Sequence, residues 1–444
     1  MPEHSTALAV YADRYDSVRA ALPGADQNWL QDMRDAGLKR FMALGFPGPR
    51  EESWRFTNLR ALTDTALEPL GSVSVHASDL ARLIPQDIDA ACGARLVFVN
   101  GVAVPELWQN NLDTSGLHIA SLADEIAENP EWVAAHLGHL LPMGSDSIAA
   151  LNTALMQDGY VIRVDRKATI SKPIHIVSIG TANGALSFHP RGILSADALS
   201  KVSVIESHVG TKGSVYFSNP AIEIFVGENA QVGHYRLQDD SKDAFNIGRF
   251  AVQVRRDGRF DGFSLATGAR LSRNEGSLTL AETGSHLAIN GAYLLRRTQQ
   301  SDLTTVIDHA AAHTTSYESV KGVLDGSAHG VFQGQIKVRK DSQKVDGYQM
   351  NRALLLSPKA VVNAKPELEI FADDVKCSHG ATIGELDANQ LFYLRARGIP
   401  EATARQMLVE AFVSEAIEAI EDDVARVAFA GRAAAWMTEI EPTQ

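Results

Sequence analysis

Apolar residues at the start of the chain recur three or four positions apart, the spacing of an amphipathic α-helix. This pattern covers residues 8–22 and is interrupted at Pro23 and Gly24. It resumes over residues 29–44 and ends at the next group of breakers, Gly45, Pro47 and Gly48. We therefore expect residues 1–94 to form a helical N-terminal region.

The pattern becomes mixed over residues 95–158. Leu96, Phe98 and Val104 lie in a β-like stretch, and Asn100-Gly101 is the turn signal between its two arms. A mainly helical insertion follows at residues 122–156, with an internal stop at residues 129–130, where asparagine precedes proline. This segment is expected to be a mixed α/β connecting region.

Residues 159–384 form a long succession of short apolar runs separated by glycine, aspartate and asparagine. Clear examples are residues 160–164, 174–177, 221–226 and 250–254, each of strand length and rich in β-forming residues. The fold class is therefore mainly β, and both a sandwich and a parallel β-helix fit the pattern. Frequent glycines favour the β-helix by indicating many corners without hairpin spacing; they stand at positions 227, 233, 248, 258, 262, 268, 276, 284 and 291.

Helical spacing returns in residues 385–444, where two helices are expected at residues 388–397 and 401–427. The second has an apolar stripe that includes Phe412 and Ile417, with acidic residues on its other faces. Such a stripe either faces the protein's own core or docks a partner. Pattern alone leaves both interpretations open.

Composition and charge exclude several classes of function. The apolar fraction of 45% is that of an ordinary globular protein, and a net charge of −13 opposes binding to nucleic acid. The short basic clusters at Arg255-Arg256 and at Lys337, Arg339 and Lys340 are interpreted as solvated strand faces. We expect a cytoplasmic protein, because the sequence has neither a signal-peptide pattern nor an apolar run long enough to cross a membrane.

Motifs of common enzymes are missing. Residues 210–214 resemble a phosphate-binding loop only in composition, and no G-x-S-x-G, H-E-x-x-H or C-x-x-C motif occurs. The enzymatic alternative is a β-helix carbohydrate-active enzyme that uses paired carboxylates such as Asp239 and Asp240.

Two pairs of residues are candidates for metal binding. His309 and His313 stand four apart, but we expect them to be polar positions satisfied within the fold, because no third ligand is near in sequence. Cys377 and His379 would project from the same face of an extended strand and offer a soft and a borderline ligand. A packed, unreactive Cys377 is the alternative. With Cys92 as the only other cysteine, both thiols are expected to be free.

Several ordered motifs resemble the SufB/SufD family. They are E-S-W-R-F-T-N-L at residues 52–59, K-G-V-L-D-G at 321–326, V-F-Q-G at 331–334, Y-Q-M-N-R at 348–352, K-P-E-L-E-I at 365–370, D-D-V-K-C-S-H-G-A-T at 373–382 and L-F-Y-L-R-A-R-G-I at 391–399. The chain is thus similar to this family over nearly its whole length.

The resemblance implies a right-handed parallel β-helix over residues 159–384 and a C-terminal helical domain over residues 385–444. It also implies a non-catalytic scaffold subunit for iron-sulfur cluster assembly, which pairs with SufB through the β-helix and binds the SufC ATPase through the C-terminal helices. The region around Phe412 and Ile417 would then contact SufC. His379 matches the histidine that the family places at the interface with SufB, and Cys377 is its neighbour.

The same resemblance sets expectations for cofactors. The isolated chain would hold no cofactor stably, while a transient iron-sulfur cluster would form at the interface with SufB and take most of its ligands from that partner. A reduced flavin belongs, if anywhere, to the whole complex. A homodimer working without SufB is the remaining alternative for the assembly.

Overall fold

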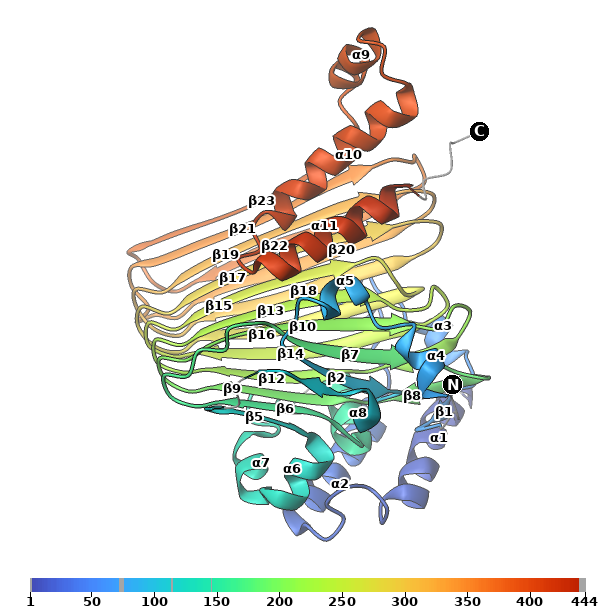
Figure 1. Ribbon diagram of the computed structural model, residues 1–444, viewed down its shortest axis with the longest axis vertical. Helices are drawn as coiled ribbons and strands as arrows, with labels where there is room; N and C mark the ends of the chain where they lie inside the picture. The colour runs from blue at the N-terminus through green and yellow to red at the C-terminus, as the bar shows by residue number, and fades with distance from the viewer. Residues whose placement is uncertain (1, 72–75, 113–114, 145, 439–444) are drawn as a thin grey trace.

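The computed structural model describes residues 2–71, 76–112, 115–144 and 146–438. Its strands wind into a parallel β-helix of about eight turns, with helices contributed by both ends of the chain (Figure 1). From β13 onward, successive strands alternate between two sheets, so each turn adds one strand to each sheet. The expected mainly β fold with a parallel β-helix is therefore confirmed.

The strands of the first sheet, sheet A, follow one another across it in chain order. They are β5 (Leu117–Ser121), β6 (Gly159–Val164), β9 (Arg191–Ala196), β12 (Ala221–Val226), β14 (Phe245–Val254), β16 (Leu271–Leu280), β18 (Gln300–His309), β20 (His329–Val338) and β22 (Val361–Ile370), with β1 (Glu68–Pro69), β8 (Ala185–Phe188) and β11 (Val215–Ser218) at its side. All these pairings are parallel except that of β5 with β6.

The second sheet, sheet B, has the same arrangement. It contains β3 (Val102–Ala103), β2 (Ala94–Val99), β7 (Ile174–Gly180), β10 (Lys201–Gly210), β13 (Gln231–Asp239), β15 (Arg259–Ala266), β17 (His286–Leu295), β19 (Thr315–Leu324), β21 (Val345–Leu355) and β23 (Val375–Gly384), with β4 (Gln109–Asn110) beside β2. The predicted turn at Asn100-Gly101 joins β2 to β3, and both of its residues have positive φ, at 48° and 79°. Residues 95–158 thus also contribute strands to the two sheets.

Parallel pairing stacks equivalent positions of successive turns into columns. Leu271 of β16 lies opposite Gln300 of β18, which lies opposite His329 of β20. Because side chains alternate between the two faces of a strand, every column points either into the β-helix or out of it. The inward columns carry most of the apolar core, including Ile176, Val204, Val232, Val252, Phe260, Leu278 and Ile307.

The prediction that the glycines mark corners is wrong for five of the nine. Those at positions 233, 248, 262, 276 and 291 lie inside β13, β14, β15, β16 and β17. At several of them the missing side chain makes room for an aromatic ring on an adjacent position. A Cβ on Gly276 would lie 2.2 Å from the ring of Phe250 on the neighbouring strand.

Helices from the first part of the chain cover the outer face of sheet A at its early turns (Figure 1). They are α1 (Pro2–Val18), α2 (Asn28–Leu44), η1 (Glu52–Trp54), α3 (Arg60–Thr63), α6 (Leu122–Glu128), α7 (Pro130–His136) and α8 (Ser147–Leu155). Three shorter elements, α4 (Ala77–Ala81), α5 (Gln86–Asp89) and η2 (Pro105–Leu107), pack instead against the early strands of sheet B. Tyr11 and Phe41 of this layer pack in one cluster with Phe217 and Phe245 of sheet A. The expected N-terminal helices and the stop at residues 129–130 are confirmed.

The C-terminal region contains α9 (Ala388–Ala396), α10 (Glu401–Ile417) and α11 (Asp423–Thr438). The expected single helix over residues 401–427 is therefore wrong, because the chain leaves α10 at Glu418 and starts a new helix at Asp423. The apolar stripe of α10 and α11 packs on the outer face of sheet B, where Ile417 and Phe429 join a cluster with Phe263. This stripe faces the protein's own core.

The last turn leaves one end of the β-helix open. Among the described strands, β22 pairs only with β20, and β23 only with β21. Apolar side chains are exposed here as well, namely Val361, Ile370, Phe371 and Ile383. We call the free edges of β22 and β23 and the interior between them the open end. No helix in the described part of the chain is long and apolar enough to cross a membrane.

Candidate functional site at the open end

Cys377 and His379 both lie on β23, the last strand of sheet B. In register, Cys377 stands opposite Gly347 and His379 opposite Gln349 of β21. The Sγ of Cys377 would be 3.4 Å from a Cβ on Gly347, and Cys377 packs against Ile336 and other inward-facing residues. Cys377, and therefore also His379 two residues later, faces the interior of the last turn. The predicted strand and the shared face are confirmed.

The two side chains differ in environment. Cys377 is partly buried against an apolar cluster of Ile336, Val338, Val345 and Ala372. Burial raises the pKa of its thiol, although the backbone amide of Gly347 opposes that shift. His379 is exposed, because no further turn covers the open end. The imidazole is thus the readily available ligand, whereas the thiol needs a deprotonating partner before it binds a metal.

A buried polar column continues below His379 into the β-helix. Gln349 lies opposite Glu318 of β19, and its Nε2 donates a hydrogen bond of 2.7 Å to Glu318 Oε2. Thr305 of sheet A donates to the other carboxylate oxygen at 2.6 Å. Burial raises the pKa of Glu318 to about 7, against the opposing effect of these two hydrogen bonds. A fully buried carboxyl that titrates near neutrality therefore lies two turns below His379.

The opposite sheet reaches the open end through an outward polar column. Arg249, Glu275, Thr304, Gln333 and Lys365 stand opposite one another on β14, β16, β18, β20 and β22. The segment of residues 52–57, which we call the N-terminal strap, crosses these strands on the outside. Gln333 donates to the backbone oxygen of Ser53 at 2.9 Å, and Lys365 donates to Glu52 at 2.8 Å. The strap therefore reaches the last turn of sheet A.

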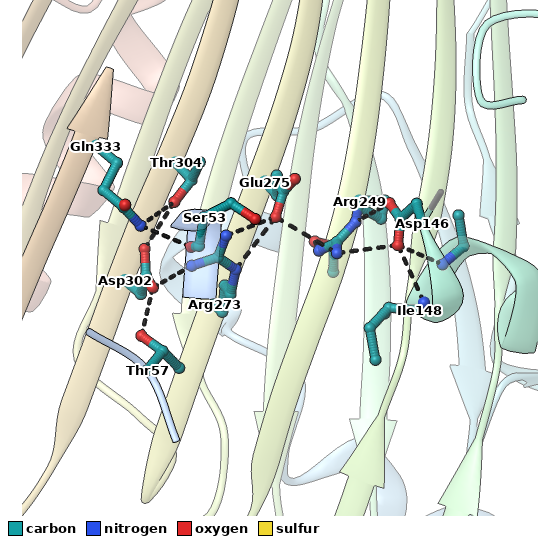
Figure 2. Close-up of polar contacts among 12 residues, drawn as sticks. Ser53, Thr57, Asp146, Ile148, Arg249, Arg273, Glu275, Asp302, Thr304 and Gln333 are labelled. Atoms are coloured by element: carbon teal, nitrogen blue, oxygen red, sulfur yellow. Dashed lines mark hydrogen bonds and ion pairs between the residues drawn. The ribbon is translucent and has the colours of Figure 1, made fainter. Parts of the chain in front are cut away.

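The centre of the strap is held by buried charges (Figure 2). Asp302 accepts hydrogen bonds from Thr57 and from Arg273, and Arg273 also pairs with Glu275 at 2.7 Å. The Arg273 guanidinium lies 4.1 Å from the centre of the Trp54 ring. Since Asp302 and Arg273 are fully buried, this network anchors the strap at the middle of sheet A and leaves its Glu52 end exposed.

Other polar groups predicted from sequence lie elsewhere and are satisfied within the fold. His309 ends β18 and forms hydrogen bonds with Thr314 at 2.7 Å and Ser316 at 2.9 Å, while His313 lies in the following loop. The two histidines are not brought together. In the basic clusters, Arg255 pairs with Glu282, Arg339 with Asp308 and Lys337 with Glu369.

The paired carboxylates of the enzymatic alternative do not form an acid and base pair. Asp240 is buried and accepts hydrogen bonds from Tyr216 at 2.8 Å, Gln238 at 2.7 Å and Asn246 at 2.9 Å. Asp239 instead pairs with Lys242 at the surface. In the part of the chain that the structure describes, no three histidine, cysteine or acidic residues are placed to hold a metal ion together.

Sequence reasoning did not find Gln349, Glu318 or the exposed face of α9. Gln349 lies in the Y-Q-M-N-R motif at residues 348–352, but its place between Glu318 and His379 follows only from the register, in which the three residues are each about one turn of the β-helix apart. On α9 no residue is buried; Phe392 is 73% and Tyr393 56% exposed. This helix projects beyond the sheets in Figure 1. Exposed aromatic side chains on a projecting helix are a recognisable sign of a contact surface.

Comparison with known proteins covers nearly the whole chain. Residues 178–412 match the model described as SUF system FeS cluster assembly, SufBD core domain, and residues 5–176 match the SufBD protein N-terminal region. An iron-sulfur cluster assembly SufBD family protein of Synechocystis is 33% identical over 90% of each chain. The iron-sulfur cluster assembly protein SufD of Escherichia coli is 30% identical, over 87% of this chain and 88% of its own. SufD of Bacillus subtilis is 26% identical over 88% and 90%.

Proposed function

We propose, from the premise that this chain belongs to the SufBD family of iron-sulfur cluster assembly proteins, that it is the non-catalytic SufD-type scaffold subunit of a complex with SufB and SufC. The observation that carries the proposal is the open end, where two free strand edges lie beside Cys377 and His379. The nascent cluster is the cargo of this complex rather than a resident cofactor of the isolated chain.

The open end is the surface proposed for pairing with SufB. Unpaired strand edges with exposed apolar residues are a liability in a protein that works alone, because they attract other strands. A second β-helix of similar cross-section would cover the edges of β22 and β23 together with Val361, Phe371 and Ile383. A homodimer would use the same surface, so the absence of SufB would favour self-association.

His379 is proposed as a ligand to iron at that interface, and Cys377 as a weaker candidate. An exposed imidazole at a joint between two subunits can bind metal as soon as the partner supplies further ligands. Because the described residues offer no complete metal site, most ligands come from SufB in this proposal. The cluster would then form only in the assembled complex.

The surface proposed for SufC is α9, not the stripe around Phe412 and Ile417. Ile417 is buried against sheet B, and Phe412 packs beside it with Lys321 over its ring, so neither is free for a partner. Phe392 and Tyr393 are exposed, and the helix that carries them, α9, projects beyond the sheets (Figure 1).

Coexpression with SufB and SufC, followed by affinity capture and native mass measurement, tests the assembly. We expect a complex of this chain with one SufB and two SufC. The double variant Phe392→Ser/Tyr393→Ser should lose SufC bound to this chain and keep SufB. The matched control is Val427→Ser, which removes an apolar side chain that is 71% exposed on α11 and should keep both partners. Full SufC capture by the double variant would refute the α9 surface.

The cluster site is tested in the same complex with His379→Ala. Because the side chain of His379 is exposed at the last turn, folding and partner binding should persist. The yield of iron-sulfur cluster per complex should fall strongly. An unchanged yield would remove His379 from the ligand set.

A further inference from the structure

Gln349 has a buried acceptor without a partner. Its Nε2 is engaged by Glu318, but its Oε1 is fully buried and has no hydrogen-bond partner among the described residues. Leaving a buried amide oxygen unpaired is unfavourable, so a donor that can reach this atom would be stabilising. Gln349 itself has no exposed surface.

Glu318, one turn below, fixes the orientation of the Gln349 side-chain amide. Both oxygens of Glu318 already accept hydrogen bonds, from Thr305 and from Gln349. Turning the amide over would place its oxygen against a carboxylate oxygen and lose the donated bond. Space for this arrangement comes from Gly334 on sheet A, where a Cβ would lie 2.1 Å from Gln349 Nε2.

His379 is the next inward-facing residue above Gln349. The two stand opposite each other in the parallel register of β21 and β23, and neighbouring strands are about 4.8 Å apart. An imidazole that binds a metal through one nitrogen carries a proton on the other, and that N–H needs an acceptor to set the tautomer and the ring orientation. Gln349, the residue opposite His379 on the neighbouring strand, carries such an acceptor in its unpartnered Oε1.

We propose that Gln349, held in place by Glu318, accepts the ring N–H of His379 and thereby leaves the other ring nitrogen directed to the open end for iron. Gln349 and Glu318 are then positioning residues that act through His379. This inference rests on the proposed function for the role of His379, but the proposed hydrogen bond involves only this chain and is tested without a partner.

The hydrogen bond is tested by the tautomer of His379 in the full-length chain. Two-bond ¹H–¹⁵N NMR spectra above pH 8 distinguish the two neutral tautomers, and the His379→Gln spectrum identifies the signal among the 14 histidines. In the native protein we expect a single tautomer at His379. In Gln349→Met, where the acceptor is lost, we expect a mixture of both, and Gln349→Glu should restore the single tautomer because a carboxylate also accepts.

The control variant is Gln238→Met. Gln238 is also buried, also donates its Nε2 to a carboxylate, that of Asp240, and also has an unpartnered Oε1, but it lies far from β23 in sheet B. It should leave the His379 signal unchanged. A mixed tautomer in the native protein, or identical His379 signals in native and Gln349→Met chains, would overturn the proposal. The native spectrum alone decides the matter if Gln349→Met fails to fold.

A second measurement separates this inference from the proposed function. In the complex with SufB and SufC, Gln349→Met should lower the yield of cluster at least about tenfold, as expected for an outer partner of a metal ligand. If His379→Ala leaves the yield unchanged, the proposed ligand role fails while the tautomer result still stands. If His379→Ala abolishes cluster formation but Gln349→Met has native yield and a native tautomer, only the positioning role fails.

Discussion

Replacing Asp302 with alanine should release the N-terminal strap from sheet A. Asp302 is fully buried on β18 and accepts hydrogen bonds from Arg273, Thr57 and Thr304 (Figure 2). Its removal leaves the buried Arg273 guanidinium with Glu275 as its remaining carboxylate partner. It also leaves Thr57 of the strap without its carboxylate acceptor. The strap and the strands below it should therefore lose stability together.

The size of the effect follows from these contacts. Removing one partner of a buried ion pair costs about 3–5 kcal/mol. Arg273 keeps its pair with Glu275 at 2.7 Å, so the lower end, about 3 kcal/mol, applies. With an unfolding entropy of roughly 2.1 cal/mol/K per residue, a chain of 444 residues loses about 3 °C of melting temperature for this free energy.

Asp308→Ala is the matched control, on the same strand. Asp308 also pairs with an arginine, Arg339, which directly follows β20, the next strand of sheet A. The side chain of Arg339 is, however, 54% exposed. Exposed pairs contribute at most about 1 kcal/mol, so its melting temperature should fall by no more than about 1 °C. Calorimetry measures both variants, and hydrogen exchange at residues 53–57 should accelerate only in Asp302→Ala. Equal melting temperatures for the two variants would refute the reasoning.

Three further predictions concern single residues. Because burial raises the folded-state pKa of Glu318 from 4.5 to about 7, its neutral form contributes stability that is fully present below about pH 4.5 and is lost as pH rises through about 7. Glu318→Gln should remove this part of the pH dependence and stabilise the protein above pH 7 by up to about 3 kcal/mol. If the free energy of unfolding of the native protein and of Glu318→Gln changed in parallel from pH 5 to 8, this prediction would be contradicted. Burial raises the pKa of the Cys92 thiol to about 12. Iodoacetamide at pH 8 should therefore alkylate Cys377 at the open end before Cys92, as measured by mass spectrometry. The reverse order would count against the placement of both thiols. Gly276→Ala should destabilise by about 1–3 kcal/mol, since its Cβ would lie 2.2 Å from an aromatic ring, whereas Gly384→Ala, with nothing within 4 Å, should stay within about 0.5 kcal/mol in the same urea titration.

The strands were predictable because local sequence determines them. The run over residues 221–226 coincides with β12, and Asn100-Gly101 forms the predicted turn because both residues accept positive φ. Cys377 and His379 share a face for the same local reason, the alternation of side chains along a strand. Each of these features is determined by residues that are adjacent in the sequence.

The features that sequence reasoning missed depend on contacts between turns. The partner of Gln349 on the next turn is set by the length of the intervening corners, which varies from turn to turn, and no local pattern records it. The glycines inside strands have the same origin, since Gly276 is required by a ring on the adjacent turn. The break between α10 and α11 has a local signal, because the Asp422 carboxylate accepts hydrogen bonds from the backbone amides of Val424 and Ala425 at the start of α11.

The last turn is held from both sides by residues that are distant in sequence. On sheet A, Lys365 of β22 reaches the strap through Glu52, while on sheet B the inward column of Glu318 and Gln349 ends beneath His379. The strands of the last turn, β22 and β23, each have a strand neighbour on one edge only, so this turn lacks the second set of backbone hydrogen bonds that orders the turns below it. Side-chain anchors must supply that order until a partner covers the edge. The buried anchors, Asp302 on β18 and Glu318 on β19, both lie two turns below the open end. There each strand is paired on both edges and can hold them rigidly, while the groups they support remain accessible to a second subunit.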